Sequence, residues 1–275
     1  MPRWTSVYSD RDLTFFMILY GNHDLADSCL RRLRKHFPGA RVILRSDGDH
    51  DPGYPALAAR HNAAYWKEER LFAAERGGAV VHRMLQIFLY HPTRYLFKID
   101  PDTAIHRRFR YLPIGQALFG TIQGATEYRS IQGGFIGVTL EAARTMADSR
   151  LLLSPVLRRP PAEERSHLGK VALRARLHGL ASFDWSLGWA AGQTDIELID
   201  FPEVYSVYGE VVSIPDGEPP SFAATHPTEL SKAGRRDARR RAAEGSLQHG
   251  AASDEPGAAV TTRGASLASR PGAPE

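Results

Sequence analysis

Cysteine is almost absent from this sequence. The 275 residues include one, Cys29, so no disulfide can form within the chain and no metal site can be built from cysteine thiolates alone. A reducing compartment tolerates such a chain. We therefore expect a cytoplasmic protein in which Cys29 is a core residue.

Long apolar runs are also missing. The longest run near the start, Leu13–Tyr20, has eight residues, whereas a membrane-spanning helix needs roughly 18 consecutive apolar residues. Charged residues precede this run and no small-residue cleavage site follows it, which is unlike a signal peptide. The sequence predicts no transmembrane segment, and we interpret Leu13–Tyr20 as a strand.

No strong charge of either sign is concentrated in the main part of the chain. The formal net charge is +4, but residues 1–228 carry 27 Lys and Arg against 25 Asp and Glu. A nucleic-acid-binding domain would present a concentrated basic face, so we expect no nucleic-acid partner. The hydrophobic content of 43% is that of an ordinary globular domain with a sizeable core.

Aromatic residues are missing from residues 243–275, where 20 of 33 positions are Ala, Gly, Ser or Pro. Such a segment buries too little apolar surface to offset the entropy lost on ordering. Just before it, Ser231–Arg241 holds six basic residues and one acidic residue, which is typical of a solvated tail or of a nucleic-acid-binding arm. We expect a single domain over residues 1–228 and a basic, low-complexity, disordered tail over residues 229–275.

Strand and helix patterns alternate along the remaining sequence. Strands are predicted at Leu13–Tyr20, Arg41–Arg45, Tyr95–Ile99, Gly120–Gly124, Gly133–Val138, Ile196–Phe201 and Val204–Tyr208. Helices are predicted at Leu25–Phe37, Ala56–Arg76, Val80–Tyr90, Leu140–Asp148, Ser166–Leu180 and Asp184–Gly192. This alternation indicates an α/β fold with a mostly parallel central sheet flanked by helices on both faces.

The most informative segment joins a strand to two carboxylates. The apolar run Tyr95–Ile99 leads directly into Asp100 and Asp102, which lie on one side if the chain stays extended. Two carboxylates at the carboxyl end of a strand form an oxygen site suited to Mg²⁺ or Mn²⁺, at the place where open α/β sheets bind ligands. The alternative is a plain turn, which Asp and Pro both favour.

The segment Phe97–Asp102 resembles the DxD motif of nucleotide-sugar-dependent glycosyltransferases of the GT-A fold. The motifs that support this resemblance by their order are Ser46–Asp49, Ser130–Gly137, Ser182–Gly188 and Thr225–Pro227. They look like the end of the nucleotide-binding half, the acceptor-side glycine loop, the segment that supplies a general base, and a late histidine ligand. The resemblance implies a GT-A type domain with a Rossmann-like nucleotide-binding half over roughly residues 12–228.

The resemblance also implies a function and a set of site residues. The protein would move a hexose from a nucleoside diphosphate sugar, expected to be a UDP-sugar, to a hydroxyl acceptor. Mn²⁺ or Mg²⁺ would be bound by Asp100, Asp102 and His226, and Asp184 would be the general base of an inverting reaction. The residues that would contact the nucleotide sugar are Asp47, Asp49, Lys98, Asp100, Gly133 and Gly134.

Each of these residues also has a purely structural interpretation. Asp184 precedes a predicted helix and is a candidate helix cap, Lys98 is a candidate for an ion pair with a neighbouring carboxylate, and Asp47 with Asp49 fits a turn. Two other functions are compatible with the sequence: nucleotidyl transfer to a sugar phosphate, and a non-catalytic adaptor acting through the basic tail. The former normally needs a glycine-rich phosphate loop, whereas Tyr20–Asp24 contains one glycine.

Overall fold

The computed structural model of the chain describes residues 3–48, 51–71, 73, 75–124, 129–158, 181–206 and 222–226. All of them belong to Met1–Ala233, the first of two units into which the chain divides. The predicted helix Ser166–Leu180, the predicted tail and Asp49 lie outside the described residues.

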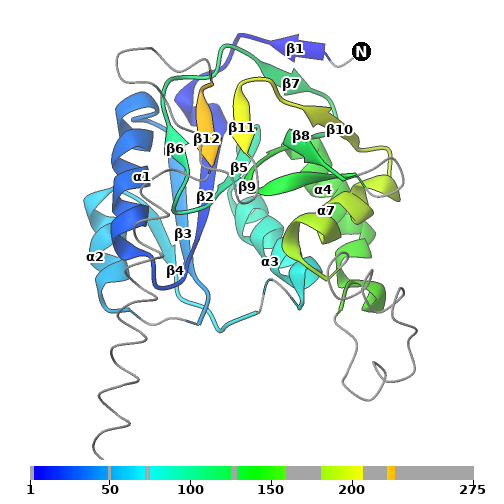
Figure 1. Cartoon of the computed structure of the whole chain (residues 1–275), viewed down its shortest axis with the longest axis horizontal. Helices are drawn as coiled ribbons and strands as arrows, with labels where there is room; N and C mark the ends of the chain where they lie inside the picture. Colours follow the sequence, from blue (N-terminus) through cyan, green and yellow to red (C-terminus); the bar gives the residue numbers. More distant parts are fainter. Residues whose placement is uncertain are drawn as a thin grey trace, which may run out of the picture. The chain divides into compact units, whose positions relative to one another are not determined.

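A seven-stranded sheet forms the centre of this unit (Figure 1). Its strands are β2 (Leu13–Leu19), β3 (Arg41–Ser46), β4 (Ala64–Trp66), β5 (Tyr95–Ile99), β8 (Ala117–Gln123), β9 (Ser130–Thr139) and β10 (Glu197–Asp200). They lie in the order β10-β8-β9-β5-β2-β3-β4, and β9 alone among these seven runs against its neighbours β5 and β8. The expectation of a mostly parallel sheet is confirmed.

Helices cover both faces of the sheet, and each face has its own apolar core. The helices are α1 (His23–His36), α2 (Gly53–Arg60), α3 (Gly77–Tyr90), α4 (Leu140–Ser149) and α7 (Phe183–Gly192), with short 3-10 turns η1 (Asp10–Asp12), η2 (Leu151–Leu153) and η3 (Pro155–Leu157). Side chains of α1 and α2 share one core, and those of α3, α4 and α7 share the other. None of the helices in the described ranges is long and apolar enough to span a membrane.

The strand β2 illustrates why the central strands have continuous apolar sequences. Phe15 and Met17 enter the core beside α1, whereas Phe16 enters the core beside α3. Successive side chains point to opposite faces, and both faces are covered by helices. Nearly every position of the strand is therefore apolar. Cys29 on α1 is 2% exposed, which confirms its predicted place in the core.

The predicted helix over Ala56–Arg76 is wrong. Helix α2 begins earlier, at Gly53, and ends at Arg60. Asn62 then takes the left-handed backbone region with φ 47°, which Asn tolerates better than most residues. Strand β4 follows and pairs in parallel with β3, so pairing with a distant strand outweighs the local helix propensity.

Two smaller sheets complete the described structure. β1 (Arg3–Thr5) pairs antiparallel with β7 (Leu112–Ile114). In the other, β12 (Ala224–His226) is flanked by β11 (Val204–Ser206), to which it is parallel, and by β6 (Ala104–Ile105), to which it is antiparallel. Strand β6 follows the predicted metal motif directly, so this pairing brings a late segment of the chain next to that motif.

The strand order also defines a preferred place for a ligand. From β2 the chain passes through α1 to β3 on one side, whereas β5 lies on the other side of β2. At such a reversal, the crevice outside the carboxyl ends of the two central strands is where open α/β sheets bind ligands. Asp100 and Asp102 follow the end of β5 at this position.

Candidate metal and donor site

The chain turns immediately after β5. The Asp100 N–H donates to the Gly134 carbonyl at 3.0 Å, and the Thr103 N–H donates to the Asp100 carbonyl at 3.0 Å. The turn interpretation of Asp-Pro-Asp is therefore correct for the backbone. It does not exclude a ligand site, because the turn brings both carboxylates toward the same imidazole.

His226 completes a group of three potential metal ligands. Its Nε2 lies 3.0 Å from Asp102 Oδ1 and 3.5 Å from Asp100 Oδ2, and one ligand atom from each residue lies within 4.8 Å of the others. The side chain of Asp100 is 33% exposed, whereas those of Asp102 and His226 are 13% and 9% exposed. The group therefore opens to solvent on the Asp100 side.

These donors suit a divalent cation. Carboxylate oxygens favour Mg²⁺ and Mn²⁺, and imidazole is a common ligand of first-row transition metals. Two carboxylates and one imidazole leave further coordination positions for substrate oxygens or water. The chemistry of the donor set thus fits a divalent cation such as Mn²⁺ or Mg²⁺.

The strand pairing β12–β6 places His226, and a neutral histidine reinforces this pairing. His106 Nε2 lies 2.8 Å from Thr225 Oγ1. Burial, with Arg32, His36 and Arg107 nearby, lowers the pKa of His106 to about 4, so the ring is uncharged at neutral pH. Sequence reasoning did not identify His106, since its partner lies more than 100 positions away.

The two carboxylate oxygens of Asp100 face different groups, Lys98 and His226. Lys98 Nζ lies 2.5 Å from Asp100 Oδ1 and also donates to the Gly133 carbonyl. The other oxygen, Oδ2, faces His226. The ion pair considered from sequence is therefore present, and contact of Lys98 with a nucleotide sugar stays a prediction.

Two adjacent glycines of β9, Gly133 and Gly134, allow close approach of the neighbouring side chains. A Cβ at Gly134 would lie 2.0 Å from His226 Nδ1, and a Cβ at Gly133 would lie 3.5 Å from the Asp184 carboxyl carbon. Position 134 therefore accepts no side chain while His226 stays in place. Gly133 lies between the metal-ligand group and Asp184.

Asp184 is not the cap of α7. The N-cap is Ser182, and Asp184 is the second residue of the helix. Among the described residues, its carboxylate accepts hydrogen bonds from Gln123 Nε2 at 2.7 Å and from Ser182 Oγ at 3.1 Å. These bonds orient the carboxylate beside Gly133 instead of toward the helix backbone. Its role as a base stays a prediction.

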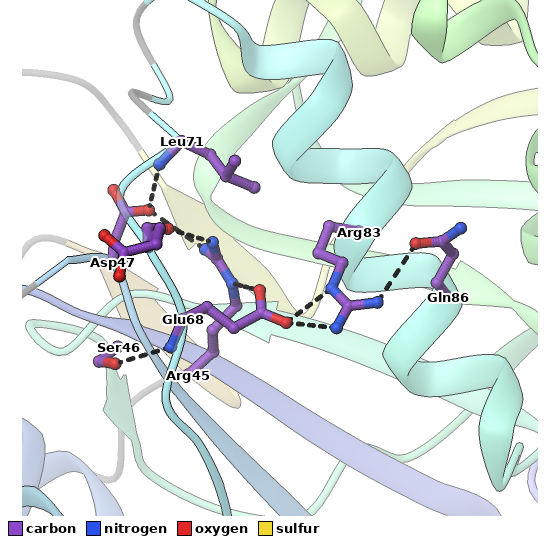
Figure 2. Close-up of polar contacts among 8 residues, drawn as sticks. Arg45, Ser46, Asp47, Glu68, Leu71, Arg83 and Gln86 are labelled. Carbon is purple, nitrogen blue, oxygen red and sulfur yellow. Dashed lines mark hydrogen bonds and ion pairs between the residues drawn. The ribbon is translucent and has the colours of Figure 1, made fainter. Parts of the chain in front are cut away.

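Asp47 belongs to a different cluster, at the end of β3 (Figure 2). Its Oδ1 accepts from the Leu71 N–H at 3.0 Å and lies 3.3 Å from Arg45 Nη1. Arg45, whose side chain is 1% exposed, also donates to Glu68 Oε2 at 2.7 Å, and Glu68 in turn pairs with Arg83. Contact of Asp47 with a donor remains a prediction, and the structure gives its carboxylate internal partners.

The Glu68 network was not anticipated from sequence, although a basic residue inside the apolar strand Arg41–Ser46 was a signal for it. Burial of Glu68 opposes ionisation, but the hydrogen bonds and charges of Arg83 and Arg45 outweigh it and hold the pKa of Glu68 below its ordinary value. The contacts of Arg45 with Glu68 and of Asp47 with Leu71 hold the segment after β4 against the end of β3.

Apart from Asp47 and the undescribed Asp49, the predicted site residues form one contiguous group around the end of β5. A small pocket adjoins this group between α1 and the Asp102 turn, with Ser28, Cys29 and Arg32 on its helical side. Burial, with the charge of Asp102, raises the pKa of the Cys29 thiol above its ordinary value. The thiol therefore stays protonated and is a poor metal ligand.

Comparisons with known proteins add little to this geometry. No protein-family model and no curated protein matches the chain. Among solved structures, the chain is similar to the mannosyltransferase PcManGT from Pyrobaculum calidifontis, solved in complex with GDP-Man and Mn²⁺, at 14% identity and a TM-score of 0.35. The similarity covers 50% of this chain and 48% of that one.

Proposed function

We propose that this protein is a metal-dependent glycosyltransferase of the GT-A type, which moves a hexose from a nucleoside diphosphate sugar to a hydroxyl acceptor. The observation that carries the proposal is the convergence of Asp100, Asp102 and His226 outside the carboxyl end of β5. This position coincides with the reversal of strand order between β2 and β5, where ligands of open α/β sheets bind.

The proposed ligands for the cation are Asp100, Asp102 and His226. A bound Mn²⁺ or Mg²⁺ would supply positive charge to the departing nucleoside diphosphate. Lys98 supports this arrangement, because it fixes one oxygen of Asp100 and leaves the other facing His226. Its ammonium also adds a positive charge at the edge of the site that a diphosphate would approach.

Asp184 is the proposed proton acceptor. A general base must lie within hydrogen-bond reach of the hydroxyl from which it removes a proton. Gln123 and Ser182 both donate to the Asp184 carboxylate, and these hydrogen bonds hold it in a fixed orientation. Gly133 lies beside it, where a Cβ would be 3.5 Å from the Asp184 carboxyl carbon; the missing side chain lets a sugar approach the backbone closely, and an inverting transfer would need the acceptor hydroxyl there.

The donor and the metal can be tested together. Titration calorimetry would measure binding of UDP and GDP with and without Mn²⁺ to the wild type, to Asp102→Asn and to the control Asp148→Asn, which changes an exposed carboxylate on α4. We expect Mn²⁺ to strengthen nucleotide binding at least tenfold in the wild type and the control, and not in Asp102→Asn. Unchanged Mn²⁺-dependent binding in a folded Asp102→Asn variant would contradict the proposal.

A further inference from the structure

Behind His226 lies a short series of buried hydrogen bonds that ends in the backbone. Gln132 on β9 and Ser206 on β11 are 5% and 1% exposed. Gln132 Oε1 accepts from the Gly134 N–H at 2.7 Å and is also contacted by Ser206 Oγ. Ser206 Oγ lies 3.3 Å from His226 Nδ1. These contacts join the backbone of β9 to the proposed metal ligand.

The backbone donor fixes the direction of the first hydrogen bond. A peptide N–H can only donate, so the Gln132 atom that faces Gly134 must be the amide oxygen. That oxygen can only accept. Because Ser206 Oγ contacts the same oxygen, the serine hydroxyl must donate its single hydrogen there.

The direction of the next bond follows from this. With its hydrogen directed at Gln132, Ser206 can only accept from the imidazole of His226. His226 Nδ1 therefore carries a hydrogen, and the neutral ring has its lone pair on Nε2. Nε2 is the atom that lies beside Asp102 Oδ1 and Asp100 Oδ2. A lone pair facing two carboxylate oxygens is repulsive, and either a proton on Nε2 or a cation among the three atoms removes that repulsion.

We infer that Gln132 and Ser206 are positioning residues that set the tautomer and orientation of His226 for binding a divalent cation. The inference rests on the proposed metal site. Partners of this kind behind a metal-bound imidazole raise its basicity, and their loss commonly weakens metal binding 10- to 100-fold. Gly134 contributes twice, because its N–H starts the hydrogen-bond series and its missing side chain leaves space for the ring.

The same segment of β9 also aligns a second ligand. The Gly134 carbonyl accepts from the Asp100 N–H at 3.0 Å and from Thr103 Oγ1 at 3.0 Å. One residue thus fixes the backbone of Asp100 through its carbonyl and the ring of His226 through its N–H. The relative placement of two ligands that are 126 positions apart in sequence is set by this residue.

Nitrogen NMR of the imidazoles tests the tautomer without metal. Spectra of metal-free protein at pH 9, with the His226 signal assigned from a His226→Gln spectrum, would show which ring nitrogen carries the hydrogen. We expect hydrogen on Nδ1 in the wild type, and a mixture of tautomers or the Nε2–H form in Ser206→Ala. Hydrogen mainly on Nε2 in the wild type would overturn the inference.

Mn²⁺ affinity, measured by electron paramagnetic resonance of the free ion, tests the consequence. Ser206→Ala removes the acceptor and Gln132→Met removes the amide oxygen, so both variants should bind Mn²⁺ about 10- to 100-fold more weakly. Gln132→Glu keeps an oxygen that accepts both hydrogen bonds and should bind at least as well as the wild type. Ser46→Ala is the matched control, since it deletes a fully buried serine hydroxyl on β3 and should leave affinity unchanged.

The outcomes separate this inference from the proposed function. If Asp102→Asn and His226→Gln bind Mn²⁺ as the wild type does, the metal site itself is wrong. If those two variants lose affinity while folded Ser206→Ala and Gln132→Met keep it within about twofold, the metal site stands and the positioning role is overturned. Thermal melts of each variant identify any that fail to fold, and the two variants at different positions provide independent tests.

Discussion

The ends of β3 and β5 both carry clustered charges, but the chain treats them differently. At the end of β3, Arg45 and Arg83 balance Glu68 and Asp47, and each carboxylate has a cationic partner (Figure 2). At the end of β5, the described groups are the two carboxylates of Asp100 and Asp102, the imidazole of His226 and one ammonium, that of Lys98. Among these described groups, the cations of the first cluster match its carboxylates in number, whereas in the second cluster two carboxylates converge on one imidazole.

This contrast distinguishes charges that pair within the chain from charges that the proposed function would use. Buried charges that pair within the chain hold elements together and are costly to break singly. Carboxylates that converge on an imidazole with too few cations make folding less favourable unless a ligand supplies the missing charge. The two clusters lie at the same edge of one sheet, so the difference comes from the side chains and not from their position in the fold.

Removing a cation from the first cluster should have the largest effect. Arg45→Met leaves Glu68 and Asp47 without a buried partner, and we expect a loss of about 3–5 kcal/mol in the free energy of unfolding. Urea denaturation measures this loss. Asp102→Asn is the comparison variant for the second cluster. It relieves the repulsion between the carboxylates of Asp100 and Asp102 in metal-free protein, so it should not lower the free energy of unfolding. Equal losses in the two variants would remove the distinction between the clusters.

Asp184→Asn tests the carboxylate that flanks the second cluster. The side-chain oxygen of Asn still accepts a hydrogen bond, but Asn cannot take a proton at neutral pH. Turnover should fall about 10²- to 10⁴-fold while the melting temperature and donor affinity barely change. Transfer assays with the true acceptor provide the measurement. Wild-type turnover in this variant would move the base elsewhere or favour a retaining mechanism.

Gly134→Ala should disturb the second cluster through shape alone. The new methyl group would lie 2.0 Å from His226 Nδ1, so the imidazole must move. We expect Mn²⁺ affinity to fall at least tenfold and stability to fall by about 1–3 kcal/mol. Gly192→Ala is the control, because a Cβ there meets nothing within 4 Å. Calorimetry and thermal melts of both variants distinguish a steric effect at the site from a general effect of replacing glycine.

The smallest effect should be an acid sensitivity of the first cluster. Since ion pairs hold the pKa of Glu68 below its ordinary value, its stabilisation is present above the unfolded-state pKa of about 4.3 and is lost as pH falls through the lower, folded-state pKa. Unfolding free energies measured from pH 6 to pH 2 should therefore decline less steeply in Glu68→Gln than in the wild type. Parallel declines in the two proteins would show that ionised Glu68 does not contribute to the free energy of unfolding.

Local patterns in the sequence were sufficient for the α/β alternation and for most helices. The strands β2 and β5 are buried on both faces, so their apolar runs stand out, and the spacing of Ala26, Cys29 and Leu33 marks the buried face of α1. The segment after Arg60 was wrong because its conformation depends on pairing with β3. No local sequence pattern predicts the pairing of β4 with β3.

The candidate site was predictable in its parts but not in its geometry. The strand leading to Asp100 and Asp102 signals a ligand-binding edge from sequence alone. The meeting of Asp102 with His226 depends on the pairing of β12 with β6, and the roles of Gln132 and Ser206 depend on contacts between β9 and β11 that no spacing rule gives. The capping interpretation of Asp184 failed by two positions, because the N-cap is Ser182 and the helix begins at Phe183.

The position of β12 late in the sequence determines when the proposed group of metal ligands can be completed during synthesis. Asp100 and Asp102 leave the ribosome more than 120 residues before His226. A nascent chain that has exposed the whole of β5 therefore has an incomplete ligand set until residues 224–226 emerge and pair with β6. If the proposed site binds a cation, its capture would be coupled to completion of the domain, and partly made chains would retain the metal less tightly.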